Sequence, residues 1–349
     1  MPHGPVVESL MERGFHVYAI NPKQLDRFRD RFSPAGAKDD SRDAMVLADA
    51  LRTDAHCFRP LLTLDPLLVE LREWSRILDE LHLDRTRLGH RVRELLWRYY
   101  PQLLEVSQDI AAPWFLALWR LVPTPAKVAR VHEATIARLL KRYRSRRLHG
   151  RQVLEMLRTI PVPVAAGTVA AATGQLETVA ARLDLVNYQI ASAELQLDRL
   201  TVALSVPVEP SGPQLGEQRD VAILRTLPGV GRIVLATLLA EASDALRRRD
   251  YHALRCLSGV APITKRSGKK REVLMRQAVQ GRLRNAVDHW ARVAVQHDPR
   301  SREKYAALRA RGHGHARALR SVADWLIAVA CKMLVSQTAF DPSLARRAD

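Results

Sequence analysis

The sequence predicts a mainly α-helical protein with a small α/β segment at its start, and three observations support this fold class. Residues 15–20 are a β-branched and aromatic run that follows Gly14 and ends at Asn21-Pro22, which is the clearest strand signal in the chain. Two later segments carry long apolar stripes at heptad spacing. In the C-terminal third, apolar residues recur at helical spacing between basic ones.

The first sixty residues form the α/β segment. Residues 6–13 read as a helix before the strand, residues 33–38 as a loop, and a second helix is expected from about Asp40 to Thr53. We therefore assign residues 1–60 to one small unit.

Residues 61–205 are predicted to be a helical region that contains both stripes. The first stripe is interrupted by Arg85 and comprises Leu67, Leu71, Trp74, Leu78, Leu81, Leu88, Val92 and Leu95. The second is unbroken and comprises Leu176, Val179, Leu183, Val186, Ile190, Ala193, Leu197, Leu200 and Leu204. Such stripes are typical of an antiparallel or dimeric coiled coil, and the alternative is the face of an ordinary helical bundle.

Between the stripes, prolines break residues 112–163 into shorter helices. The run 141–151 (KRYRSRRLHGR) is basic and contains no acid; it either contacts nucleic acid or is a solvated helix face. Residues 206–218, rich in proline and glycine, are the candidate linker. A helical C-terminal domain is expected over 219–337, followed by a tail over 338–349.

The charge favours a polyanionic partner. Lys and Arg number 55 against 37 Asp and Glu, a formal charge of +18. A GC-rich genome would explain Arg in place of Lys, but it would not explain the excess of bases over acids. Residues 265–320 alone hold sixteen Lys or Arg and four Asp or Glu. DNA or RNA is the expected partner.

The three cysteines are far apart and form no CxxC pair, which argues against structural zinc and a disulfide framework and fits a reducing cytoplasm. The most apolar stretch, about residues 325–335, contains Lys332 and is too short to span a bilayer, and no signal peptide is evident. We expect a cytoplasmic protein without a membrane partner.

The first chemical motif is Lys38–Ala44 (KDDSRDA). Asp40 and Asp43 are three residues apart at a helix start, so both carboxylates lie on one face and could bind Mg²⁺, with Asp39 as a possible substitute. The alternative is that they only cap the helix and complement its dipole.

The second motif is Leu227–Gly231 (LPGVG), a turn before an apolar helix that resembles the hairpin of helix-hairpin-helix modules. Gly229 and Gly231 would let backbone N–H groups receive a DNA phosphate, unless the turn only joins two helices.

The third motif is the predicted loop around Ser267, within the loop-like stretch 258–271. Its bases are expected to bind phosphates, together with Gly268, which allows close backbone approach; they are Lys265, Arg266, Lys269, Lys270 and Arg271. Ser267 could attack phosphorus among these cations, but no His/Asp pair is evident beside it, so a plain phosphate-binding loop stays open.

Taken in order, these motifs resemble one family, the DEDD insertion-sequence transposases, which are related to Piv-type DNA invertases and described as bridge-RNA-guided recombinases. The resemblance runs from residues 14–22 through Lys38–Ala44 and Leu227–Gly231 with the downstream Leu-Leu-Ala-Glu. It continues at residues 259–262, at Ser267-Gly268 and at residues 283–285, where Arg284 joins the nucleic-acid-binding set.

The resemblance implies an RNase-H- or resolvase-like N-terminal domain that holds Mg²⁺ through an Asp-Glu-Asp-Asp tetrad, with Asp40 and Asp43 as its third and fourth members. It implies a C-terminal transposase domain in which Ser267 forms a covalent phosphoserine with DNA. The implied partners are DNA, a guide RNA and further copies of the chain, in a dimer or tetramer.

The resemblance departs at the start, where only one strand precedes Asp40. We expect an N-terminally truncated chain with half of its metal site, unable to cleave DNA at the level of a version extended upstream. The competing hypotheses are a non-catalytic DNA- or RNA-binding remnant and a helix-hairpin-helix repair or scaffold protein.

Overall fold

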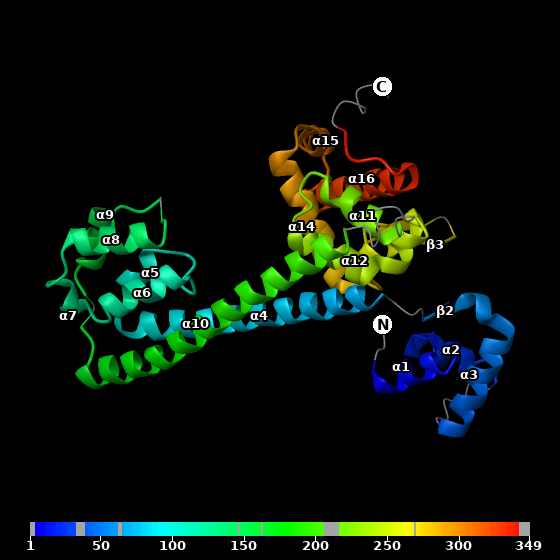
Figure 1. Cartoon of the computed structure of the whole chain (residues 1–349), viewed down its shortest axis with the longest axis horizontal. Helices are drawn as coiled ribbons and strands as arrows, with labels where there is room; N and C mark the ends of the chain where they lie inside the picture. Colours follow the sequence, from blue (N-terminus) through cyan, green and yellow to red (C-terminus); the bar gives the residue numbers. More distant parts are fainter. Residues whose placement is uncertain are drawn as a thin grey trace. The chain divides into compact units, whose positions relative to one another are not determined.

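A computed structural model describes residues 4–32, 39–61, 65–145, 147–161, 163–205, 216–268 and 270–341 (Figure 1). The described chain is mainly helical, as predicted, and it divides into two compact units, Met1–Pro66 and Leu67–Asp349. Within the described ranges, no helix is both long enough and apolar enough to cross a membrane. The expected linker over 206–218 falls largely on residues outside this description.

The first unit holds two short strands among helices. Its elements are α1 (Pro5–Glu12), β1 (Tyr18–Ala19), α2 (Pro22–Arg29), α3 (Asp40–Asp54), the 3₁₀ turn η1 (Ala55–Cys57) and β2 (Arg59–Pro60). The strand predicted over 15–20 is wrong in length, because only Tyr18 and Ala19 pair, antiparallel to β2. This pairing does not confirm an RNase-H-type sheet. Val46 and Ala50 on α3 are buried, whereas Val6 and Phe15 are largely exposed.

The second unit is built on two long helices, α4 (Pro66–Tyr99) and α10 (Ala166–Ala203), which run antiparallel beside each other (Figure 1). We call this pair the arm. Every residue predicted for the second stripe is buried, which confirms that stripe as a core face. The first stripe is less regular, since Leu67 is exposed and its neighbour Leu68 is buried instead. Arg85 interrupts the stripe for a reason: its Nε donates to Asn187 Oδ1 of α10 over 2.9 Å.

One end of the arm carries a bundle of short helices, which we call the tip. It comprises α5 (Gln102–Glu105), α6 (Pro113–Leu121), α7 (Pro125–Val128), α8 (Glu133–Arg142) and α9 (Gly150–Leu157). The last four are the short helices that the prolines of residues 112–163 predicted. Tyr99, at the end of α4, anchors the tip. Its hydroxyl accepts a hydrogen bond from Trp119 Nε1 over 2.8 Å and donates to the carbonyl of Pro123 over 3.0 Å, while both rings are buried.

The other end of the arm meets the C-terminal body. This body comprises α11 (Gly216–Arg225), α12 (Arg232–Arg247), α13 (Tyr251–Ser258), β3 (Ile263–Ser267), β4 (Lys270–Leu274), α14 (Gly281–His297), α15 (Pro299–Ala310) and α16 (His315–Ser336). Helix α14 is central and contacts α12, α13, α15 and α16. Its Trp290 is fully buried and donates from Nε1 to the carbonyl of Pro228 over 2.8 Å.

A buried carboxylate joins the arm to the body. The side chain of Glu241, on α12, is only 5% exposed and forms ion pairs with Arg282 of α14 and Arg76 of α4. Arg282 also reaches two groups of α4, with its Nε 2.6 Å from Asp79 Oδ2 and its Nη2 2.7 Å from Ser75 Oγ. Because three helices share these charges, their relative rotation and register are fixed together.

Removing this carboxylate tests its role. Glu241→Ala removes the acceptor of the Gln280 amide and one of the two carboxylates that pair with Arg282, so we expect it to lower the free energy of unfolding by about 1 to 3 kcal/mol. Glu94→Ala breaks an exposed ion pair with Arg91 and should cost about 0 to 1 kcal/mol. Urea unfolding followed by circular dichroism measures both, and equal small losses would contradict the role given to Glu241.

The predicted turn Leu227–Gly231 does join two helices, α11 and α12. Gly229 has φ +79°, and a Cβ there would lie 2.9 Å from the backbone nitrogen of Ala294 on α14. Gly231 has φ −86° and open space around it. The first glycine is therefore required by the close approach of α14, and the second is not.

The two glycines therefore give a matched pair. Gly229→Ala combines a left-handed backbone with a contact against α14, and we expect a loss of about 2 to 4 kcal/mol. Gly231→Ala should lose less than about 1 kcal/mol, the difference expected at a helix N-cap. Thermal unfolding of the two variants checks this order, and a normal melting temperature for Gly229→Ala would refute it.

Candidate functional site

The stretch predicted as a loop over 258–271 is instead the end of a helix followed by most of a β-hairpin, so the loop prediction is wrong. Helix α13 ends at Ser258, and Gly259 follows it with φ +76°. Strands β3 and β4 then pair antiparallel, with Ser267 opposite Lys270. Gly268 supplies the positive φ of +56° that the tight turn needs, and Lys269, also predicted to bind nucleic acid, lies outside the described residues.

The strand geometry sorts the predicted residues onto two faces. Side chains alternate along a strand, so Ser267 shares a face with Lys265, Lys270 and Glu272. The Nζ of Lys270 lies 2.7 Å from Oε1 of Glu272. All four residues are exposed. One face of the hairpin therefore presents a hydroxyl beside two ammonium groups.

The other face brings Arg266 and Arg271 directly opposite each other. Like charges at paired positions destabilise a hairpin. No acidic side chain in the described part of the chain forms an ion pair with either arginine, and both are exposed. An anion lying across the strands would remove this repulsion, which is the electrostatic property expected of a phosphate-binding hairpin.

The hydroxyl of Ser267 has no hydrogen-bond partner among the described residues and is open to a ligand. The hairpin thus offers a hydroxyl and cations, and the carboxylate on the same face, that of Glu272, is paired with Lys270. The apolar side chains of Val273 and Leu274, at the end of β4, and of Met275, which follows it, are also exposed. The hairpin projects its chemical groups into solvent and does not enclose them in a pocket.

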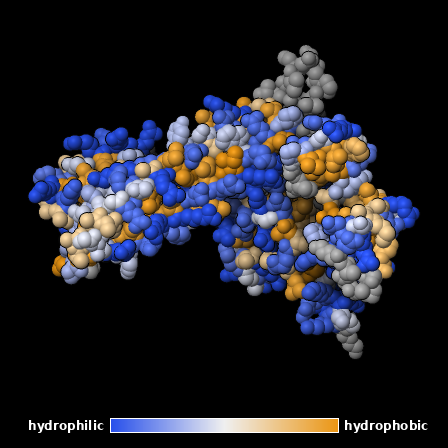
Figure 2. Space-filling view, turned by 90° about the horizontal axis from the view of Figure 1, so that it is seen from below, coloured by the Kyte–Doolittle hydropathy of each residue, from blue (hydrophilic) through white to orange (hydrophobic). Residues whose placement is uncertain are grey.

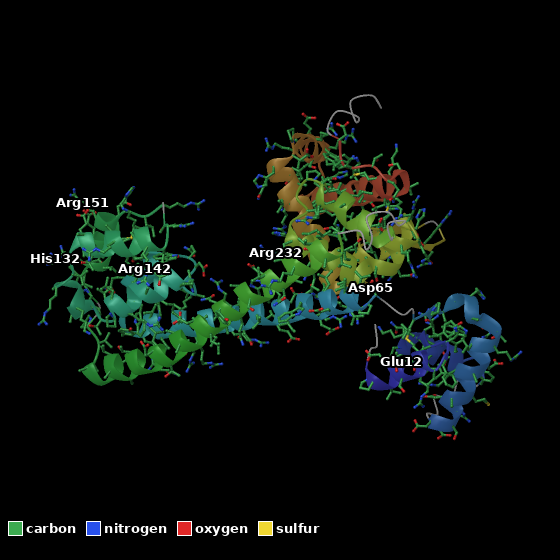
Figure 3. The ribbon with its side chains drawn as sticks, viewed as in Figure 1. Glu12, Asp65, His132, Arg142, Arg151 and Arg232 are labelled. Atoms are coloured by element: carbon green, nitrogen blue, oxygen red, sulfur yellow. The ribbon has the colours of Figure 1, made fainter. Side chains whose placement is uncertain are left out.

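The remaining predicted binding residues of this unit lie in the body. Arg284, on the first turns of α14, is half-buried beside Gly259. Gly229 is used for packing, and Gly231 precedes α12, whose first residue, Arg232 (Figure 3), pairs with Glu194 and Asp198 of α10 over 2.8 and 2.7 Å. Two carboxylates therefore lie near the amino end of α12, which disfavours a phosphate there and leaves DNA contact by this turn a prediction.

The predicted acidic pair lies in the first unit, on the first turn of α3. Asp40 is the first residue of the helix and is exposed, with Asp39 at the N-cap position. Asp43 lies one turn further and is largely buried against Arg29 of α2, whose Nε is 2.6 Å from its Oδ1. The sequence did not predict the role of Arg29, because Arg29 and Asp43 are fourteen residues apart and no local pattern indicates that they meet.

The acidic pair fits a divalent ion in part. Two carboxylates on one helix turn are hard oxygen donors of the kind that Mg²⁺ prefers. However, the guanidinium of Arg29 already neutralises Asp43, and no third His, Cys, Asp or Glu joins the pair among the described residues. A metal ion bound there would have to displace Arg29 from Asp43.

A second group of potential ligands, which the sequence did not suggest, lies at the end of α3. Ligand atoms of Asp54, His56 and Cys57 lie within 4.8 Å of one another. Asp54 is engaged by Arg31, whose Nη1 is 2.8 Å away, and this hydrogen bond, followed by one from the hydroxyl of Thr53, lowers the pKa of the carboxyl. The same contacts stabilise the charged carboxylate without any metal.

Family models of known proteins match a segment in each half of the chain. Residues 2–101 match a family model of DEDD transposases, a type that usually uses a divalent metal ion, and residues 221–306 match a model described as transposase, IS116/IS110/IS902 family. The acidic turn lies inside the first match and the hairpin inside the second.

The relatives agree with these matches. A Sinorhizobium fredii protein named as a transposase is 66% identical over 42% of this chain and 41% of its own length. The Streptomyces coelicolor protein named as the transposase of the IS117 mini-circle is 32% identical over 98% of this chain and 81% of its own. An IS110 insertion-element protein of the same species is 29% identical over 88% and 73%. The chain therefore belongs to the IS116/IS110/IS902 family of transposases.

Proposed function

We propose that Ser267 is the nucleophile for cutting and rejoining DNA, with low activity expected of a chain whose metal site has only Asp40 and Asp43. The observation that carries the proposal is the placement of Ser267 on one face of an exposed hairpin with Lys265 and Lys270, in a body rich in bases. A hydroxyl beside two ammonium groups is suited to attack on phosphorus, since the cations stabilise the charge that develops on the phosphate oxygens.

The proposed reaction exchanges one phosphodiester bond for another and needs no external energy source. The Ser267 hydroxyl loses its proton to solvent water, its oxygen bonds to phosphorus, and one phosphorus–oxygen bond to deoxyribose breaks, releasing a DNA hydroxyl that takes up a proton from the solvent. Attack by a hydroxyl of another DNA end reverses the exchange and frees the serine. Lys265 and Lys270 hold the phosphate during both exchanges, and Arg266 with Arg271 binds the neighbouring backbone.

We infer that Asp40 and Asp43 hold a divalent ion, Mg²⁺, once Arg29 has moved away from Asp43. When bound, such an ion would polarise a phosphate oxygen or lower the pKa of a bound hydroxyl. In the described arrangement Arg29 keeps Asp43 neutralised. That contact favours a second candidate function, a nucleic-acid-binding protein that does not cleave.

The partners follow the same proposal. DNA is the substrate, and a guide RNA is the specificity factor that the resemblance implies. Homo-oligomers would form through the arm. On the face seen in Figure 2, hydrophobic residues run between hydrophilic ones along the arm. Large apolar side chains are exposed on both helices, among them Trp97 on α4 and Leu185 and Tyr188 on α10, which supports pairing between copies.

Replacement of Ser267 tests the nucleophile. In an assay in which the wild-type chain joins DNA ends, Ser267→Ala should lower strand transfer at least about 100-fold and abolish the covalent protein–DNA species seen on a denaturing gel, because the attacking oxygen is gone. Ser336→Ala, which removes a hydroxyl at the end of α16, is the control. DNA affinity should be unchanged in both variants; full strand transfer by Ser267→Ala would leave binding without catalysis as the function.

The acidic pair is tested by metal binding, measured as Mn²⁺ uptake by electron paramagnetic resonance. Asp40→Asn and Asp43→Asn should each abolish uptake, while Arg29→Gln should bind the ion more tightly than wild type because it frees Asp43. Asp43→Asn should also cost about 1 to 2 kcal/mol of stability without metal, and Asp40→Asn less than about 0.5. Unchanged uptake by Asp40→Asn would reject the site.

A further inference from the structure

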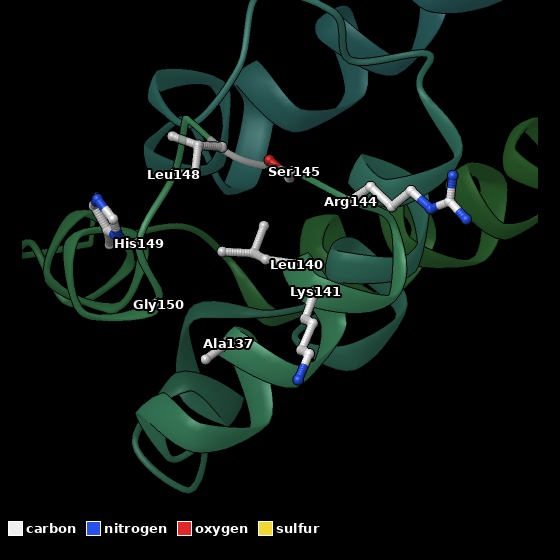
Figure 4. A pocket seen from close by; sticks show the side chains of 8 residues that line it. All are labelled: Ala137, Leu140, Lys141, Arg144, Ser145, Leu148, His149 and Gly150. Atoms are coloured by element: carbon white, nitrogen blue, oxygen red, sulfur yellow. The ribbon is translucent and has the colours of Figure 1, made fainter.

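A pocket opens at the tip, between α8 and α9, far along the sequence from the hairpin. Its volume is about 510 Å³, within the ~300 to 1,000 Å³ typical of small-ligand sites. Figure 4 shows Leu140 in the centre of the site, with Leu148 above it and Ala137 below. The ends of Lys141, Arg144 and His149 lie around the margin and point outward. The pocket thus has an apolar interior and a basic rim.

The basic run 141–151 is the chain that forms much of this rim. It is not a solvated helix face, because α8 ends at Arg142 and α9 begins at Gly150, with a turn between them. The run holds six Lys or Arg and no acid. In the described part of it, Arg151 pairs with Glu155, whereas Lys141, Arg144 and Arg147 make no ion pair and are exposed. Uncompensated charge gathered at one pocket is an anion-binding feature.

The backbone around this pocket is constrained at Gly150 and at Arg144. Gly150 brings α9 against α8 so closely that a Cβ there would lie 3.0 Å from the carbonyl oxygen of Glu133. Arg144 has φ +53°, and the backbone N–H of Ser145 donates to the carbonyl of Leu140 over 3.0 Å. The turn is thereby fixed over the end of α8, with the buried Leu140 as the floor.

We propose that this pocket binds an unpaired nucleotide of single-stranded nucleic acid, with the base against Leu140 and Leu148 and the flanking phosphates on Lys141 and Arg144. An unstacked base needs an apolar surface, and its phosphates need cations outside that surface, which is how the two kinds of residue are arranged. Tyr143 lies next in the turn, is partly exposed and offers a surface on which the next base can stack. The guanidinium carbon of Arg142 lies 6.0 Å from the centroid of its ring.

The occupant is not a duplex. A paired base cannot enter a pocket without being extruded, and the rim contributes only a few cations where duplex binders use an extended basic surface. RNA and single-stranded DNA share the chemistry proposed here. Because the pocket lies at the tip and Ser267 lies in the C-terminal body, this proposal stands even if the serine chemistry is wrong.

The test uses the full chain and fluorescence anisotropy with a labelled oligouridylate, the matching single-stranded DNA and a duplex DNA. Lys141→Gln combined with Arg144→Asn, in which Asn tolerates the positive φ, removes two rim charges. The control is Arg87→Gln with Arg91→Gln, which removes two exposed charges from the arm. A third variant, Leu148→Ser, changes the interior without changing the charge.

The rim variant should weaken single-strand binding about tenfold, while the control changes Kd less than about twofold. The slope of log Kd against log salt concentration should fall by about 1 to 2 in the rim variant. Leu148→Ser should weaken binding about threefold with the salt dependence unchanged. An oligonucleotide that carries 2-aminopurine should become more fluorescent when the wild-type pocket unstacks that base, and Leu148→Ser should abolish this rise. Ser267→Ala should leave all three readouts at the wild-type value.

The outcomes separate the alternatives. Binding of both single strands indicates recognition of base and phosphate, and binding of RNA alone adds contact to the 2′-hydroxyl; both support the pocket. Equal losses by the rim and control variants, equal losses for duplex and single strand, or an unchanged 2-aminopurine signal in Leu148→Ser overturn it. Circular dichroism and melting temperature identify a variant that has lost its fold, and Lys141→Gln alone, at an exposed helix position, then provides the measurement.

Discussion

The buried carboxylate of Glu241 is the constraint on which the second unit depends. It lies where α4, α12 and α14 meet, and it compensates Arg282 and Arg76 in a place where neither guanidinium is fully hydrated. Apolar packing alone would let the arm and the body slide or rotate, since leucine contacts are not directional. Directional charge pairs specify one arrangement, in which the first turn of α14 is held against α4 and α12.

The hairpin shows how a local charge conflict can serve binding. Arg266 faces Arg271 across the strands, and on the opposite face Ser267 stands between lysines, with only Glu272 as a partial counter-charge. A sequence selected for stability alone would alternate these signs. The cost of the repulsion is small in water. Under the proposed function a polyanion would take the place of the missing acids, so that affinity and salt dependence would arise from the same residues.

The same principle separates the two acidic positions of α3. Asp40 is exposed and free to accept a ligand, while Asp43 is held by Arg29 and contributes to the packing of α2 on α3. In a unit with few buried apolar side chains, an ion pair that joins two helices carries much of the tertiary specificity. Metal binding at this turn, as proposed, would therefore compete with helix packing for one carboxylate.

The sequence by itself determined the elements whose signals are local. The unbroken stripe from Leu176 to Leu204 fixed the buried face of α10, because heptad spacing and helix geometry are the same information, and the spacing of Asp40 and Asp43 placed both on the first turn of α3. Only the tertiary structure decided which charges meet: Arg29 with Asp43, Arg232 with Glu194, Arg282 with Glu241. In the tertiary structure, the predicted loop over 258–271 is largely a hairpin, and the basic run 141–151 borders a pocket. The ion pairs of Arg232 and Arg282 join residues distant in sequence, whose identity no local pattern of charge or hydropathy encodes. The hairpin and the pocket rim are formed by residues close in sequence, but there the run of bases gave no signal for the turn that the backbone makes.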